Sequence, residues 1–210
     1  MVELFLKGGI FMWPILILLV FGLMVAIERV YTLTKASWAT KHFVPKVSKI
    51  LQEEGVEKAL ELCEKTPGPI AEIFHAGLSK VDQGPEAVEK AIQSAGTVEM
   101  AFLDKGMIWL ATVITLAPLI GFMGTVSGMI RAFNDIAAAN DISPAIVASG
   151  ISEALLTTIF GLVVAVPIQI CYNLFTARVD GIVVEMEESS MGLLETLARV
   201  QNKKSNKEEK

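Results

Sequence analysis

Three long apolar stretches, each with at most one charged residue, dominate the pattern of apolar and polar positions along the chain. Gly8–Ile27 contains twenty residues and Gly106–Ile130 contains twenty-five, all without a charge. A third stretch, Ser143–Ala177, contains a single charged residue, Glu153. About 20 helical residues are enough to cross the ~30 Å hydrocarbon core of a bilayer. The pattern therefore predicts three membrane-spanning helices.

The region between the first two stretches is more polar and repeats apolar residues at helical spacing. Helix breaks are expected at Gly55, at Thr66–Pro69 and at Gln83–Pro85, where glycine and proline cluster. Proline suits the first position of a helix. Because no breaker follows before Gly106, we expect one helix to run from about Pro85 through the second span.

These elements predict an all-α membrane protein. We expect spans two and three to extend into the cytoplasm and to pack with short cytoplasmic helices. The expected segments are a periplasmic N-terminus with the first span (1–29), a cytoplasmic helical region (30–105), the second span (106–131), a periplasmic loop (132–143), the third span (144–177), and a cytoplasmic helical extension with a disordered tail (178–210).

The distribution of charge supplies the orientation. Ten of the eighteen Lys and Arg residues lie from Arg29 to Lys105, and six follow Ala177. Positively charged loops stay on the cytoplasmic side of a membrane. The N-terminus is therefore expected outside, and both the region 30–105 and the C-terminus are expected in the cytoplasm.

Composition and motifs exclude several classes of function. The chain is 52% hydrophobic, which is untypical of a soluble domain. Its two cysteines and two histidines have no metal-binding spacing, and a phosphate loop, a catalytic triad and a dinucleotide fingerprint are all absent. We expect no metal, no cofactor, no enzymatic activity and no nucleic-acid partner.

Small residues recur at helical spacing in the second and third stretches. Gly121, Gly124 and Gly128 share one face, and Gly124 and Gly128 have the GxxxG spacing of closely packed membrane helices. In the third stretch, Gly161 belongs to a stripe of small and hydroxyl-bearing residues. These faces predict helix packing through close backbone approach.

Two prolines, Pro118 and Pro167, fall inside the predicted spans. Proline has no N–H group, so each one frees the carbonyl of the preceding turn, near Ile114 and Val163 respectively. Protein groups or water must then satisfy that carbonyl. We expect a kink or an irregular contact at both positions.

The candidate chemistry consists of hydroxyls and one carboxylate. Glu153 is expected at or just inside the outer face, where a carboxylate either faces a bundle interior or simply stays hydrated. A threonine hydroxyl can relay a proton through hydrogen bonds but cannot hold one at neutral pH. If protons cross, the titrating group must therefore come from a partner helix that carries a carboxyl group.

Two motifs give the chain a resemblance. The run Ala117–Ile130 (APLIGFMGTVSGMI), together with Gly150–Leu162 (GISEALLTTIFGL) and Ala165–Pro167, resembles the ExbB/TolQ branch of the MotA/TolQ/ExbB proton-channel family. Three spans agree with this branch, whereas MotA-type stators have four. The motifs leave open whether the branch is ExbB or TolQ.

The resemblance implies an inner-membrane motor whose ring is formed by five copies of this chain. The ring would enclose the membrane helices of two ExbD/TolR-like partners, each carrying an aspartate, and would also act with a TonB- or TolA-like periplasm-spanning protein. Thr125, Thr158 and Glu153 fall on the family positions that line the proton route near that aspartate. The motor would energise transport or envelope processes at the outer membrane. The alternative is a non-conducting membrane scaffold that oligomerises and stabilises a partner helix.

Overall fold

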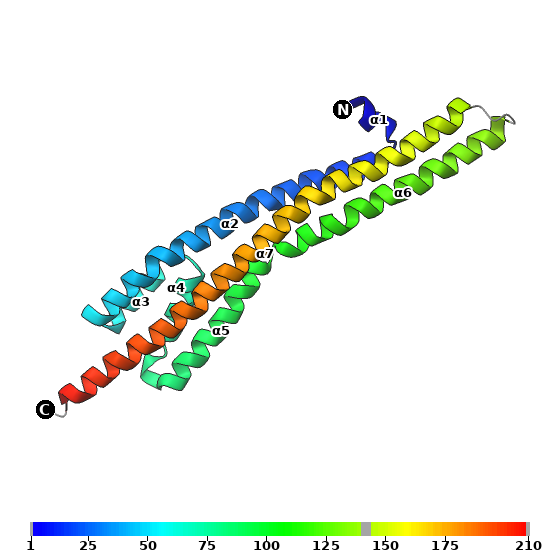
Figure 1. Cartoon of the computed structure of the whole chain (residues 1–210). Coiled ribbons are helices and arrows are strands. Elements are labelled where there is room, and N and C mark those ends of the chain that lie inside the picture. Colours follow the sequence, from blue (N-terminus) through cyan, green and yellow to red (C-terminus); the bar gives the residue numbers. More distant parts are fainter. Residues whose placement is uncertain (1, 140–143, 209–210) are drawn as a thin grey trace. The chain divides into compact units, whose positions relative to one another are not determined.

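The computed structural model describes residues 2–139 and 144–208 of the chain, and the regular secondary structure of this part is all helical (Figure 1). Parts of α2, α6 and α7 are long and apolar enough to cross a membrane, which confirms the predicted all-α membrane protein. The helices are α1 (Val2–Lys7), α2 (Met12–Glu53), α3 (Val56–Lys65), α4 (Pro69–Leu78), the 3₁₀ turn η1 (Val81–Gln83), α5 (Pro85–Asp104), α6 (Met107–Ala139) and α7 (Pro144–Glu208).

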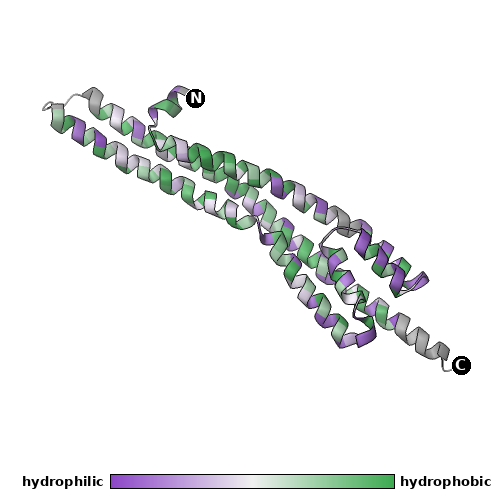
Figure 2. Ribbon diagram, turned by 180° about the vertical axis from the view of Figure 1, so that it is seen from behind, coloured by the Kyte–Doolittle hydropathy of each residue, from purple (hydrophilic) through white to green (hydrophobic). Residues whose placement is uncertain are grey.

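The chain divides into two compact units. Unit 1 combines the chain up to Arg29 with Gly106–Phe175, and unit 2 combines Val30–Lys105 with the chain from Thr176 onward. Hydrophobic residues predominate on the helices of unit 1, whereas the helices of unit 2 carry more hydrophilic residues than those of unit 1 (Figure 2). Both α2 and α7 contribute residues to both units.

Unit 2 follows the helix breaks expected from the sequence. α3 begins after Gly55, α4 begins at Pro69 and α5 begins at Pro85. Gly84 precedes α5 with a φ of +98°, a backbone conformation that favours glycine because it has no Cβ. The expected breaks are therefore confirmed, and each lies at the start of a short helix.

The core of unit 2 consists of large apolar side chains. Phe74 on α4 is 1% exposed, and its ring centroid lies 5.8 Å from that of Phe43 on α2. The other fully buried large side chains of this unit are Leu33, Leu51, Ile70, Ile73, Leu78, Leu103, Ile182 and Leu193.

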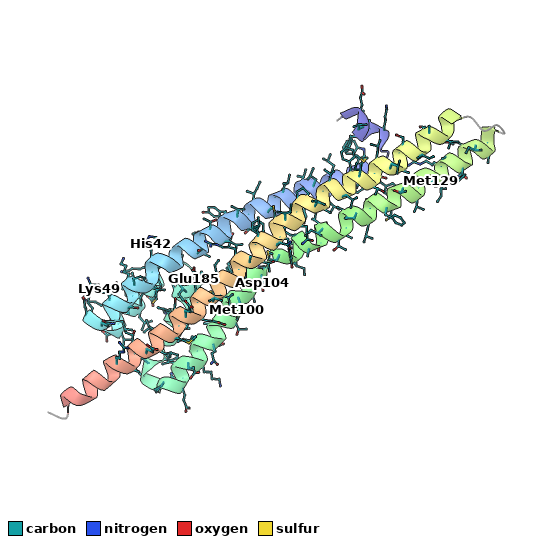
Figure 3. All side chains as sticks on the ribbon, viewed as in Figure 1. His42, Lys49, Met100, Asp104, Met129 and Glu185 are labelled. Atoms are coloured by element: carbon teal, nitrogen blue, oxygen red, sulfur yellow. The ribbon has the colours of Figure 1, made fainter. Side chains whose placement is uncertain are left out.

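Pro85–Ala138 forms one long helical stretch that reaches through the second span, as expected, but a short turn interrupts it. α5 ends at Asp104, labelled in Figure 3, and a turn at Lys105 and Gly106 separates it from α6. A Cβ on Gly106 would lie 2.7 Å from Cδ of Arg29, whose side chain is buried. Glycine is a poor helix former, and here its small size leaves room for the arginine. Gly106 thus lies against a residue from another helix.

Two helices are longer than the sequence indicated. α2 continues past Arg29 to Glu53, with Pro45 inside it, so the first span is extended as the third is in α7. α6 continues to Ala139 through an alanine-rich stretch without glycine or proline. Positions 140–143 of the expected loop lie outside the described residues.

Candidate functional site

In unit 1, α6 and α7 touch through their backbones. A Cβ built on Gly121 would lie 2.8 Å from the carbonyl oxygen of Thr157, and one built on Gly161 would lie 2.6 Å from that of Ala117. Both neighbours are backbone atoms and cannot turn away as a side chain can. A larger residue at either glycine would therefore force the two helices apart. We call this contact, from Ala117 to Ala132 on α6 and from Gly150 to Gly161 on α7, the seam.

The seam also receives a threonine for which the sequence pattern indicated no role. Thr157 is fully buried, and its hydroxyl donates to the carbonyl of Ala154 at 2.8 Å. A Cβ on Gly124 would lie only 2.6 Å from Cβ of Thr157, so this glycine makes room for the threonine. Gly128 lies in the same way against Ala154. Its neighbour Met129 is labelled in Figure 3 and shows where this part of α6 lies. Ala154 and Gly161 lie at i−3 and i+4 from Thr157, and this helical spacing could have indicated that Thr157 shares the packed face of α7.

The hydroxyls of Thr125 on α6 and Thr158 on α7 are hydrogen-bonded to each other. The Thr125 hydroxyl also lies 3.0 Å from the Ala154 carbonyl oxygen, and the Thr158 hydroxyl lies 3.4 Å from that of Gly121. Each hydroxyl has one proton and can also accept hydrogen bonds. Either threonine can therefore donate to the other or to a carbonyl of the opposite helix, and the direction of the pair can reverse.

Thr125 does more than bond its own helix, as membrane threonines often do. Its distance to the Gly121 carbonyl oxygen, one turn earlier on α6, is 3.4 Å, which is longer than the 3.0 Å to Ala154 across the seam. By contrast, within the described residues Thr115 on the same helix donates to its own helix, to Ala111 at 3.0 Å. Thr115 and Thr125 thus differ in which helices their hydroxyls contact.

Glu153 on α7 forms an ion pair with Arg131 on α6. Its side chain is 18% exposed, whereas that of Arg131 is 48% exposed. The backbone of Gly9 also lies close, because a Cβ there would come 2.9 Å from the carboxyl carbon of Glu153. The carboxylate is therefore enclosed by three segments of unit 1.

Comparison with known proteins identifies the family. Residues 65–188 match the model of the MotA/TolQ/ExbB proton channel family. The chain belongs to this family. This confirms the resemblance given by the motifs, and the family comprises proton channels rather than enzymes.

Relatives carry both ExbB and TolQ names. The chain is 31% identical over 186 residues to an ExbB homolog from Methanothermobacter thermautotrophicus, covering 88% of this chain and 66% of that protein. It is 30% identical over 175 residues to an ExbB-like protein from Synechocystis, covering 81% and 82% respectively. It is also 30% identical over 198 residues to the Tol-Pal system protein TolQ from Haemophilus influenzae, covering 86% of each. The chain thus spans slightly less than two thirds of the archaeal relative.

The remaining predicted residues of this proton-channel family member lie within the two helices. Pro118 is inside α6 and Pro167 is inside α7, so neither can donate to the carbonyl one turn earlier, Ile114 or Val163. The structure joins Thr125 to Thr158 and places Ala154, a hydrogen-bond acceptor of Thr125, next to Glu153. In the described part of the chain, the side chain of Glu153 bonds Arg131 rather than either threonine. No cluster of three metal-binding side chains occurs among those residues.

Proposed function

We propose that this chain is the ring-forming subunit of an inner-membrane motor driven by the proton-motive force. It would work with a single-span partner of the ExbD/TolR kind to energise transport or envelope processes at the outer membrane. The observation that carries this proposal is the hydroxyl pair of Thr125 and Thr158, which connects α6 and α7 and reaches carbonyls on both. Family membership supports the proton as the transported ion.

The pair is suited to relay protons rather than to store them. A proton that arrives at one hydroxyl oxygen forms a new O–H bond while the original proton leaves for the next acceptor. Both threonines are neutral before and after this step. Because the structure allows either hydrogen-bond direction, the pair can be reset by rotation of the two hydroxyls.

A group that binds the proton must come from another chain. Residues 107–130 of α6 and 154–177 of α7 contain no carboxylate, imidazole or amine. We therefore assign the titrating group to an aspartate on the membrane helix of the partner. One proton crossing 100 mV releases only about 2.3 kcal/mol, so the motor must cycle repeatedly to do work at a distance.

Exposed apolar side chains support assembly in the membrane. Within the single chain, α6 and α7 expose many large apolar residues that lipid, further copies or a partner helix must cover. The exposed residues include Phe122, Met123, Val126, Ile130, Leu155, Ile159, Leu162, Val163 and Val166. We infer a homo-oligomer, with five copies as the family resemblance implies, and a TonB- or TolA-like protein as a further partner.

The charge distribution supports a periplasmic N-terminus and a cytoplasmic C-terminus.

The test is proton flux in liposomes that contain this chain and its partner under an imposed pH gradient. Thr125→Val and Thr158→Val each remove one hydroxyl of the pair, and we expect flux to fall by roughly tenfold or more. Thr115→Val is the matched control, since among the described residues its hydroxyl donates to Ala111 on its own helix. Changing the partner's membrane aspartate to asparagine should abolish flux.

The same experiment decides between this function and a non-conducting scaffold. The backbone contacts of Gly121 and Gly161 would serve a scaffold equally well. A stable complex whose wild type moves no more protons than Thr158→Val would favour the scaffold and contradict the motor.

A further inference from the structure

The ion pair of Arg131 and Glu153 combines a half-exposed arginine with a carboxylate that is only 18% exposed. The two residues are 22 positions apart and come from different helices of unit 1. Arg131 also has Asp135 one turn later on its own helix, yet in the described residues it pairs with Glu153. Within a helix, a pair in which arginine precedes the acidic residue is the less favourable order. Asp135 therefore competes weakly with Glu153 for Arg131.

A third segment closes the site from the side of the N-terminus. Gly9 lies between α1 and α2 with a φ of +73°. A Cβ there would lie 2.9 Å from the Glu153 carboxyl carbon and 3.4 Å from Nη2 of Arg131. α1 is held near α2 by an edge-to-face contact between Phe5 and Trp13, with ring centroids 5.4 Å apart. The absence of a side chain at Gly9 therefore lets the backbone cover the carboxylate.

The ion pair lies at one end of the hydroxyl cluster. Glu153 directly precedes Ala154, whose carbonyl lies within hydrogen-bond distance of both Thr125 and Thr157. From Glu153 to Thr158 the helix rises by only ~7.5 Å. Water molecules can bridge a gap of this size between polar groups.

We propose that Arg131 is a positioning residue for proton transfer. Its guanidinium binds Oε1 of Glu153 and so holds the carboxylate between Gly9 and the seam, at the end of α6 and α7 from which protons approach Thr125 and Thr158. The second oxygen, Oε2, then accepts hydrogen bonds from water at a fixed place. This inference rests on the proposed function, because it assigns Arg131 a part in the same proton route.

The test uses the liposome assay with the complete complex of this chain and its partner. Arg131→Gln should lower proton flux by roughly fivefold to tenfold, because a displaced group costs rate even when it is chemically intact. Arg131→Lys keeps the charge but loses the planar fork, so it should restore part of that flux. Glu153→Gln combined with Arg131→Gln should be no worse than Glu153→Gln alone, since both changes act on one contact.

The charge swap Arg131→Glu with Glu153→Arg separates positioning from stability. It can form the same ion pair, so assembly and the melting temperature should recover toward wild type, but flux should stay low because the carboxylate is on the other helix. Wild-type flux in the swap would overturn the proposal, since the pair would then matter only for stability. Wild-type flux in Arg131→Gln would also overturn it.

Parallel measurement of Thr158→Val distinguishes this proposal from the one on which it rests. If wild type conducts no better than Thr158→Val, the proposed function itself fails. If wild type conducts, Thr158→Val does not, and Arg131→Gln conducts normally, only the role of Arg131 is refuted.

Discussion

The seam of unit 1 and the core of unit 2 pack their helices by different means. In unit 1, α6 and α7 meet through glycine, alanine and threonine, and Gly121 and Gly161 lie against backbone atoms. In unit 2, the helices meet through large side chains such as Phe43 and Phe74. Lipid tails are as apolar as leucine, so close backbone contact and hydrogen bonds associate helices in a membrane. Where water surrounds the helices, burial of large apolar surface is the stronger driving force.

This difference has a consequence for function. A seam without bulky side chains brings hydroxyls and carbonyls of two helices within hydrogen-bond distance, as Thr125, Thr158 and Ala154 show. In the core of unit 2, α2 and α4 instead meet through the aromatic rings of Phe43 and Phe74. The tight packing of unit 1 is therefore also what assembles its candidate proton relay.

The largest expected effect concerns the core of unit 2. Phe74→Ala removes a ring that is 1% exposed, and we expect a loss of about 3–5 kcal/mol in the free energy of unfolding. Phe102→Ala on α5 is the control, because Phe102 is 55% exposed within the chain. Chemical denaturation of the purified protein measures both. Equal losses in the two variants would contradict a core centred on Phe74.

Cys63 provides an independent readout of the same core. Burial raises the pKa of its thiol to about 11, so very little thiolate is present at neutral pH. Maleimide labelling of Cys63, with Cys171 changed to serine, should be slow in the folded protein. Phe74→Ala should accelerate this labelling, whereas Phe102→Ala should leave it slow.

Alanine substitutions at two glycines of α7 should change the free energy of unfolding by smaller amounts and in opposite directions. Gly161→Ala and Gly181→Ala both add one methyl group to α7. At Gly161 the new Cβ would lie 2.6 Å from the Ala117 carbonyl oxygen, so we expect a loss of about 1–3 kcal/mol through overpacking. At Gly181 nothing lies within 4 Å, and alanine should stabilise the helix by about 0.5–1 kcal/mol.

Melting temperatures in detergent measure this contrast directly. Gly161→Ala should melt lower than wild type, and Gly181→Ala should melt at the same temperature or higher. If both shifted in the same direction, the distinction between the seam and the rest of α7 would be lost.

Features encoded within a few neighbouring residues could be predicted from the sequence. The three spans follow from uncharged runs, and the starts of α4 and α5 follow from glycine and proline at Gly68–Pro69 and Gly84–Pro85. The small faces around Gly124 and Gly161 are visible from helical spacing alone. These signals are local, so they do not depend on which helix becomes the neighbour.

Features that depend on a distant residue were not predictable. Gly106 lies against the buried side chain of Arg29, which belongs to another helix. Arg131 closes an uncharged run, and nothing in its neighbourhood indicates a partner 22 positions away. The contact of Gly9 with Glu153 likewise requires the N-terminal turn to be placed in space.

The smallest effect concerns a carboxylate at the edge of the unit 2 core. Burial raises the pKa of the half-buried Glu99 on α5, and the negative charge of Glu72 on α4 raises it further. The protonated form therefore favours folding. This contribution is complete below the ordinary glutamate pKa of about 4.3, and it is lost as the pH rises through the raised value.

Glu99→Gln should accordingly stabilise unit 2 at neutral pH, and its advantage over wild type should vanish in acid. Glu72→Gln should act in the same direction but more weakly, because burial is the larger cause of the shift. Urea denaturation of wild type and both variants between about pH 4 and pH 8 measures these differences. Parallel stability curves for wild type and Glu99→Gln would contradict the shift. A larger gain from Glu72→Gln than from Glu99→Gln would instead show that repulsion between the carboxylates outweighs burial. If the curves of wild type and Glu99→Gln were parallel, the stability contribution of Glu99 would be as insensitive to pH as that of the apolar core.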